Sequence, residues 1–67
     1  MENDWILVYT GDKLYEAEIL KEYLADHGIR SFVMNKQDSS YKFGDIELYT
    51  LSEDFMKAKY LIEKFKN

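Results

Sequence analysis

The first half of the chain changes from a strand-like to a helix-like pattern and back again, with a glycine at each change. Residues 5–10 (WILVYT) are apolar, aromatic or β-branched, which predicts a strand. Residues 13–27 contain neither glycine nor proline and predict a helix. Residues 31–36 (SFVMNK) predict a second strand. A strand, a helix and a second strand in this order form a crossover unit, which is right-handed in nearly all proteins.

The predicted helix at 13–27 has a recognisable end. Gly28 follows it, and glycine readily takes the left-handed conformation that ends many helices. Ile29 then supplies the apolar contact that often accompanies such an end. Thr10 or Asp12 is expected to cap the start of the helix. Its apolar stripe consists of Leu14, Ala17, Leu20 and Leu24.

The second half of the chain predicts a loop, a strand and a helix. Residues 37–45 (QDSSYKFGD) are polar and contain a glycine, which is typical of a loop, and residues 46–51 (IELYTL) predict a third strand. A helix is expected to begin at Ser52, because a hydroxyl is a common cap and two acidic residues follow it in the first turn. The apolar stripe of this helix consists of Phe55, Ala58, Leu61, Ile62 and Phe65.

These elements predict an α+β fold with the order β-α-β-β-α. The simplest closed arrangement is a three-stranded sheet of order 1-3-2 with both helices on one face. This two-layer sandwich is a ferredoxin-like plait that lacks its last strand. A length of 67 residues leaves room for a single domain, residues 1–67.

Composition narrows the class of protein further. The chain has no cysteine, so disulfides and thiolate metal sites are excluded. It has no apolar run of membrane-spanning length and no pattern of a signal peptide, so we expect a cytoplasmic protein without a membrane partner. The net charge of −4 and the scattered lysines argue against a nucleic-acid partner. So small a domain has little core stability to spare, which association would supplement.

Alternation along the strands predicts which side chains the helices cover. Ile6, Val8, Val33, Ile46 and Leu48 are expected to face the helices, since Glu47 is unlikely to be buried unpaired. The opposite face would then be apolar and aromatic. Two interpretations are open. In the first, one strand is reversed or the loop folds over this face. In the second, the chain associates with a second copy or another protein, either sheet on sheet through this face or through the exposed edge of the first or second strand. Its expected residues are Trp5, Leu7, Tyr9, Phe32, Met34, Tyr49 and Leu51.

No residues form a recognisable catalytic, cofactor-binding or metal-binding motif. His27, the single histidine, lies at the expected end of the first helix, where a surface position is the simplest explanation. Glu18, Glu22 and Asp26 share a helical stripe that a solvated face explains. We therefore expect no enzyme activity, no cofactor and no metal.

The loop at 37–45 is a second candidate partner-binding segment. Tyr41 and Phe43 lie on this polar connection next to Lys36 and Lys42. Such aromatic residues can bind a partner or a planar ligand, and they can equally close the edge of a small core.

The chain also resembles a family of small bacterial domains described as prokaryotic signal-transducing proteins, for which no common activity is established. The resemblance spans residues 5–65. It is carried by the stretch VYTGDKLYEAEILKEYLADHGIRSFVMNK and, after the loop, by IELYTLSEDFMKAKYLIEKF. It implies a ferredoxin-like or PII-like arrangement. In PII proteins the loop between the second and third strands contacts partners, and that position corresponds to residues 37–45.

We therefore expect a non-enzymatic regulatory or protein-interaction module that associates with itself. The alternative is a small-ligand or nucleotide sensor that acts through the loop at 37–45. The partner-binding hypothesis names Trp5, Leu7, Tyr9, Phe32, Met34, Tyr49, Tyr41 and Phe43.

Overall fold

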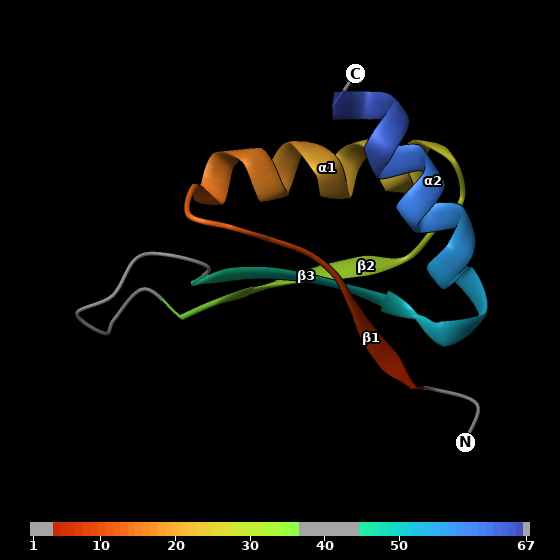
Figure 1. Ribbon diagram of the computed structural model, residues 1–67, viewed down its shortest axis with the longest axis horizontal. Helices are drawn as coiled ribbons and strands as arrows, with labels where there is room; N and C mark the ends of the chain where they lie inside the picture. Colours follow the sequence, from red (N-terminus) through yellow and green to blue (C-terminus); the bar gives the residue numbers. More distant parts are fainter. Residues whose placement is uncertain (1–3, 37–44, 67) are drawn as a thin grey trace.

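The chain forms a three-stranded antiparallel sheet with two helices on one side of it (Figure 1). The computed structural model describes residues 4–36 and 45–66. The strands are β1 (Trp5–Gly11), β2 (Ser31–Asn35) and β3 (Ile46–Leu51), in the order β1-β3-β2. The helices are α1 (Leu14–Asp26) and α2 (Phe55–Lys66), and a short 3₁₀ turn, Ser52–Asp54, precedes α2. The predicted α+β class and strand order are confirmed.

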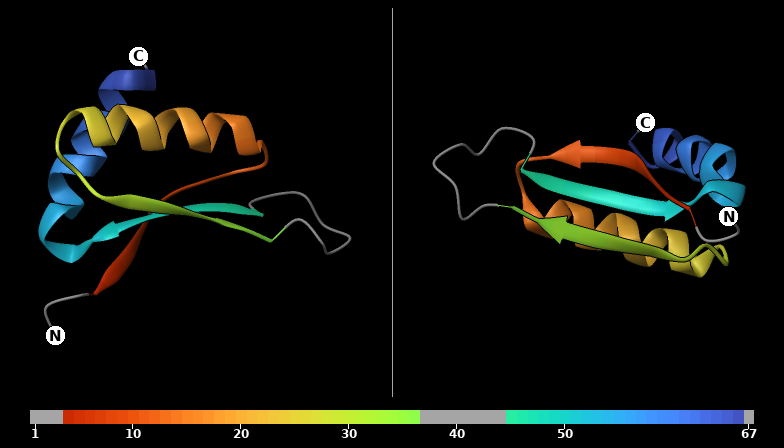
Figure 2. Two further views of the ribbon diagram at one scale, coloured as in Figure 1. Left: turned by 180° about the vertical axis from the view of Figure 1, so that it is seen from behind. Right: turned by 90° about the horizontal axis from the view of Figure 1, so that it is seen from below.

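The two helices form one layer and the sheet forms the other, and this arrangement is consistent with a two-layer sandwich. Seen from below, all three strands lie in front and neither helix covers them (Figure 2). Within the described part of the chain, neither α1 nor α2 has the length and apolar character that crossing a membrane requires.

The core lies between the helices and the sheet. Leu20 and Leu24 of α1 meet Leu48 of β3, and these three side chains are almost completely buried. The pattern of β3 is strictly alternating: Ile46 and Leu48 are buried as the sequence predicts, and Thr50 is buried on the same face. The rest of this cluster consists of Val8, Ile29, Ala58, Leu61 and Ile62.

The end of α1 follows the prediction in detail. Gly28 has a φ of +80°, in the left-handed region. Its amide donates to the carbonyl of Ala25 at 3.0 Å, and the amide of Ile29 donates to the carbonyl of Leu24 at 2.9 Å. This pair of bonds is the Schellman motif, and Ile29 joins Leu24 in the core. The chain therefore turns back toward β2 through a fixed, buried contact.

The starts of both helices differ from the prediction. The residue before α1 is Lys13, whose own side chain makes no capping hydrogen bond. Ser52 begins the 3₁₀ turn and not the α-helix, and no side chain caps that turn either. Hydroxyl and carboxylate residues are common at such positions but do not fix the first residue of a helix.

Strand β1 contains an irregularity that the alternation rule does not anticipate. Leu7 lies opposite Tyr49, and Tyr9 lies opposite Leu48. Two residues of β1 are thus spanned where β3 spans only one. Val8 is therefore the additional residue of a β-bulge. Directly opposite residues share a face of the sheet, so the strand reverses its alternation after Leu7. The prediction that Tyr9 lies on the helix-free face is wrong.

The other expected core residues on the edge strands are less buried than predicted. Val33 is half-buried and packs against the core from β2. Ile6 lies opposite the buried Thr50, yet it remains exposed. Edge strands have a neighbour on one side only, so the helices cover them less completely than they cover β3.

Candidate functional site

The helix-free face of the sheet carries three aromatic rings in contact, one from each strand. The rings of Phe32 and Tyr49 are stacked, with centroids 5.1 Å apart and an interplanar angle of 9°. The indole of Trp5 meets Phe32 edge-on, with centroids 5.0 Å apart. Both arrangements are favoured geometries for aromatic pairs. We call this cluster of Trp5, Phe32 and Tyr49 the open-face cluster.

Exposed apolar side chains continue the open-face cluster. Leu7 lies opposite Tyr49, and Met34 follows Phe32 on the same face of β2. Trp5 is 40% exposed, and Leu7 and Met34 are each 41% exposed. Six of the seven residues expected on this face are thus brought together: Trp5, Leu7, Phe32, Met34, Tyr49 and Leu51.

A paired carboxylate borders the open-face cluster. Tyr49 Oη donates to Glu47 Oε1 at 2.8 Å, and Lys36 Nζ lies 3.3 Å from the same oxygen. The hydrogen bond from Tyr49 is the largest of the interactions that hold the pKa of Glu47 below its ordinary value, and Lys36 adds to it. In return, the carboxylate raises the pKa of the Tyr49 hydroxyl. The Glu47 carboxylate, which lies opposite Met34, is therefore balanced by the Lys36 ammonium and by the hydrogen bond from Tyr49.

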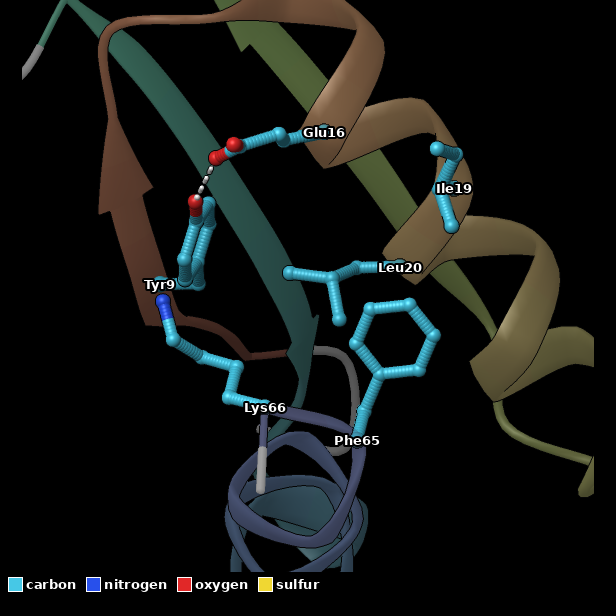
Figure 3. Close-up of a pocket in the computed structure, with 6 residues that line it drawn as sticks. All are labelled: Tyr9, Glu16, Ile19, Leu20, Phe65 and Lys66. Atoms are coloured by element: carbon cyan, nitrogen blue, oxygen red, sulfur yellow. Dashed lines mark hydrogen bonds between the residues drawn. The ribbon is translucent and has the colours of Figure 1, made fainter.

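Tyr9 instead lines a hollow on the other side of the sheet (Figure 3). Its hydroxyl donates to Glu16 Oε1 at 3.1 Å, and the Lys66 ammonium lies 5.2 Å from the centre of its ring. Burial and the carboxylate of Glu16 raise the pKa of the Tyr9 hydroxyl. Sequence reasoning missed this hollow, because Tyr9 and Lys66 lie near opposite ends of the chain and no local pattern joins them.

The predicted loop site falls on residues that the structure does not describe. Tyr41 and Phe43, together with most of the segment 37–45, lie outside the described residues. The segment is entered and left through an antiparallel contact, in which the amide of Lys36 donates to the carbonyl of Asp45 at 2.9 Å. The expected role of this loop in binding stays a prediction.

The titratable residues on α1 form no compact group. His27 Nδ1 lies 2.9 Å from the carbonyl oxygen of Tyr23, and its ring rests edge-on against the Tyr23 ring. Glu18, Glu22 and Asp26 are all exposed. Within residues 4–36 and 45–66, no three His, Asp or Glu side chains gather where they could hold a metal ion. The imidazole is thus used in local packing at the end of the helix.

Comparison of the chain with models of protein families, with curated proteins and with solved structures gives no match in any of the three. The candidate sites are therefore described by their own geometry: an apolar, aromatic face on one side of the sheet and a polar-rimmed hollow on the other.

Proposed function

We propose that this protein is a non-enzymatic regulatory or interaction module that associates with a second copy of itself through the open-face cluster. The observation that carries the proposal is the contact of three aromatic rings, from three strands, on a face that no helix covers. Aromatic side chains dominate the energetics of protein interfaces. Exposed apolar residues that adjoin one another, unlike scattered ones, are typical of interaction sites.

The charge of this face favours a second copy over a polyanion. Its one carboxylate, Glu47, is paired with Lys36, so the described part of the face is close to neutral. A nucleic acid would require clustered cations that displace its counterions, and the chain as a whole has a net charge of −4. A neutral apolar face is complementary to an identical face, which is the requirement of a two-fold symmetric interface.

The size of the face sets the expected strength of the association. The central strand has six residues, and three such strands ~4.8 Å apart with a rise of ~3.3 Å per residue present about 300 Å². Two copies would bury roughly 600 Å² in total, which is below the ~1,200 Å² at the lower limit of stable specific interfaces. We therefore expect a reversible dimer that forms at micromolar to millimolar concentration, and not an obligate one.

Sedimentation equilibrium over that concentration range tests the proposal, with two methionines as a matched pair. Met34 is on the open face and Met56 is on α2, where it is 79% exposed. Met34→Lys is expected to weaken association at least tenfold, because it places an unpaired charge in an apolar interface. Met56→Lys is expected to associate like the wild type. A wild-type protein that stays monomeric at millimolar concentration would overturn the proposal, as would equal losses in both variants.

We further infer that the chain is related to the small bacterial signal-transducing domains that its sequence resembles, and that its sheet is a ferredoxin-like plait without the last strand. Two observations support this relationship. The strand order is β1-β3-β2, and the Gly28-Ile29 pair on which the resemblance partly rests ends α1. An experimental structure of a member of that family with the same strand order and both helices on one face of the sheet would support the relationship, and a different sheet order would count against it.

A further inference from the structure

The hollow beside Tyr9 combines an apolar floor with opposite charges at its rim (Figure 3). It lies between β1, α1 and the end of α2. Leu20 is almost completely buried beneath it, whereas Ile19 and Phe65 expose nearly half of their surface. The hollow thus contains apolar surface that the protein itself leaves uncovered.

The charged groups lie at opposite ends of the Tyr9 ring. The Glu16 carboxylate accepts a hydrogen bond from the hydroxyl end of the ring. The Lys66 side chain reaches the ring from α2, and its ammonium lies near the end that joins the backbone (Figure 3). The Tyr9 ring therefore separates a carboxylate from an ammonium along one wall of the hollow. A ligand that satisfies both must itself carry both charges.

The size of the hollow limits the ligand. Its volume is about 250 Å³, which is below the ~300–1,000 Å³ of the pockets that hold drug-sized molecules. A single metabolite with one apolar branch matches it.

We propose that this hollow binds a free α-amino acid with an apolar side chain. The α-ammonium of the ligand donates to the Glu16 carboxylate, and the α-carboxylate accepts from the Lys66 ammonium. The apolar side chain covers Ile19 and Phe65. The two ion pairs set the orientation of the ligand, and the apolar floor selects against glycine and polar amino acids.

The β-bulge is what gives β1 a side chain at this site. The additional residue, Val8, turns Tyr9 away from the open face and toward α1. Gly11 then leaves room for the ring, since a Cβ there would lie 2.8 Å from Tyr9 Oη. Bulges commonly redirect a side chain next to a functional site.

Titration of the ¹⁵N-labelled protein with L-leucine, followed by ¹H–¹⁵N spectra, tests this proposal. Saturable shifts are expected at Tyr9, in residues 16–20 and at Phe65 and Lys66. Glycine, N-acetyl-L-leucine and L-leucinamide each lack one of the three recognised groups, so each is expected to bind at least tenfold more weakly. The proposal would be overturned if leucine gives no saturable shift. It would also be overturned if the acetylated compound and the amide bind as tightly as leucine does.

Matched variants separate the two charges from general effects. Glu16→Gln and Lys66→Met are each expected to weaken leucine binding at least tenfold. Glu22→Gln and Lys64→Met change an exposed residue of the same type on the same helix and are expected to bind leucine normally. Equal losses in all four variants would contradict the proposed contacts. The hollow and the open-face cluster lie on opposite sides of the sheet, so failure of one proposal leaves the other standing.

Discussion

The absence of a side chain at Gly11 leaves room for the Tyr9 ring. In Gly11→Ala the new methyl group meets the Tyr9 hydroxyl at 2.8 Å, so the ring must move and its bond to Glu16 is lost. The stability lost with this bond, about 1 kcal/mol, is offset by the ~0.5–1 kcal/mol that alanine gains over glycine in a strand. We therefore expect little change in the free energy of unfolding.

The position of Tyr9, in contrast, is expected to change in Gly11→Ala. Burial and Glu16 raise the pKa of this hydroxyl in the wild type, so the pKa should fall toward 10.0, its ordinary value, when the ring is displaced. The ¹³C shift of the ring carbon that bears the hydroxyl, measured against pH, reports this change. An unchanged Tyr9 titration in the variant would mean that the ring does not lie against Gly11.

Glu47 makes the stability of the sheet depend on pH. Its pKa in the folded protein lies below its ordinary value of 4.5, chiefly because Tyr49 donates to it and Lys36 is close by. A carboxyl group with a lowered pKa stabilises the fold above its unfolded-state pKa, and this contribution is lost as the pH falls through the folded-state value. The contribution of Glu47 should therefore begin to decline as the pH falls below about 4.5, and it should be absent once the pH lies below the lower pKa of the folded protein.

Urea unfolding at pH 7 and pH 3 measures this contribution. Glu47→Gln is expected to be less stable than the wild type at pH 7 and to lose less stability on acidification. Glu53→Gln, at an exposed position on the 3₁₀ turn, serves as the control and should lose as much as the wild type. An identical pH dependence in the wild type and Glu47→Gln would show that the bond from Tyr49 does not favour the ionised form.

The end of α1 is the element whose stability depends most clearly on one backbone conformation. A Cβ at Gly28 would meet no atom within 4 Å, so only its φ of +80° opposes a side chain there. Gly28→Ala is expected to cost about 1 kcal/mol, and Gly28→Asn less, because asparagine tolerates the left-handed region better. Thermal or urea unfolding of the two variants measures this order. An alanine variant that is more stable than the wild type would contradict it.

The elements themselves could largely be predicted from the sequence. The apolar stripe of α1, the Gly28-Ile29 end and the alternation of β3 are local patterns, and each leads to the observed structure. The bulge in β1 could not be predicted in this way. Residues 5–9 are all apolar or aromatic, so no polar residue indicates which side chains face out. The register of β1 depends on its pairing with β3, which a single sequence does not show.

The two candidate sites differ in how far the sequence indicates them. The open-face cluster follows from alternation in β2 and β3, because the faces of these strands are predicted correctly. The hollow depends on Glu16, Phe65 and Lys66 meeting Tyr9 in the folded chain. Glutamate and lysine at exposed helical positions are ordinary surface residues. Only the tertiary structure distinguishes Glu16 and Lys66 from the other glutamates and lysines of the chain.

At the scale of the whole molecule, the sheet has one covered and one uncovered face. The helices bury Leu20, Leu24 and Leu48 on one side, and the aromatic rings of the open-face cluster remain on the other. Domains of this size bury only ~60% of the surface of their unfolded chains, so their stability is small. Self-association through the uncovered face would bury apolar surface that a monomer exposes, and it would make unfolding depend on protein concentration.

An isotope-filtered NOE experiment on a mixture of ¹³C-labelled and unlabelled protein at millimolar concentration tests the proposed interface most directly. Contacts between two copies are expected from the ring protons of Trp5, Phe32 and Tyr49 and from the methyl groups of Leu7 and Met34. Contacts that arise from α1 or α2 instead, or no contacts between copies at all, would contradict association through the open-face cluster.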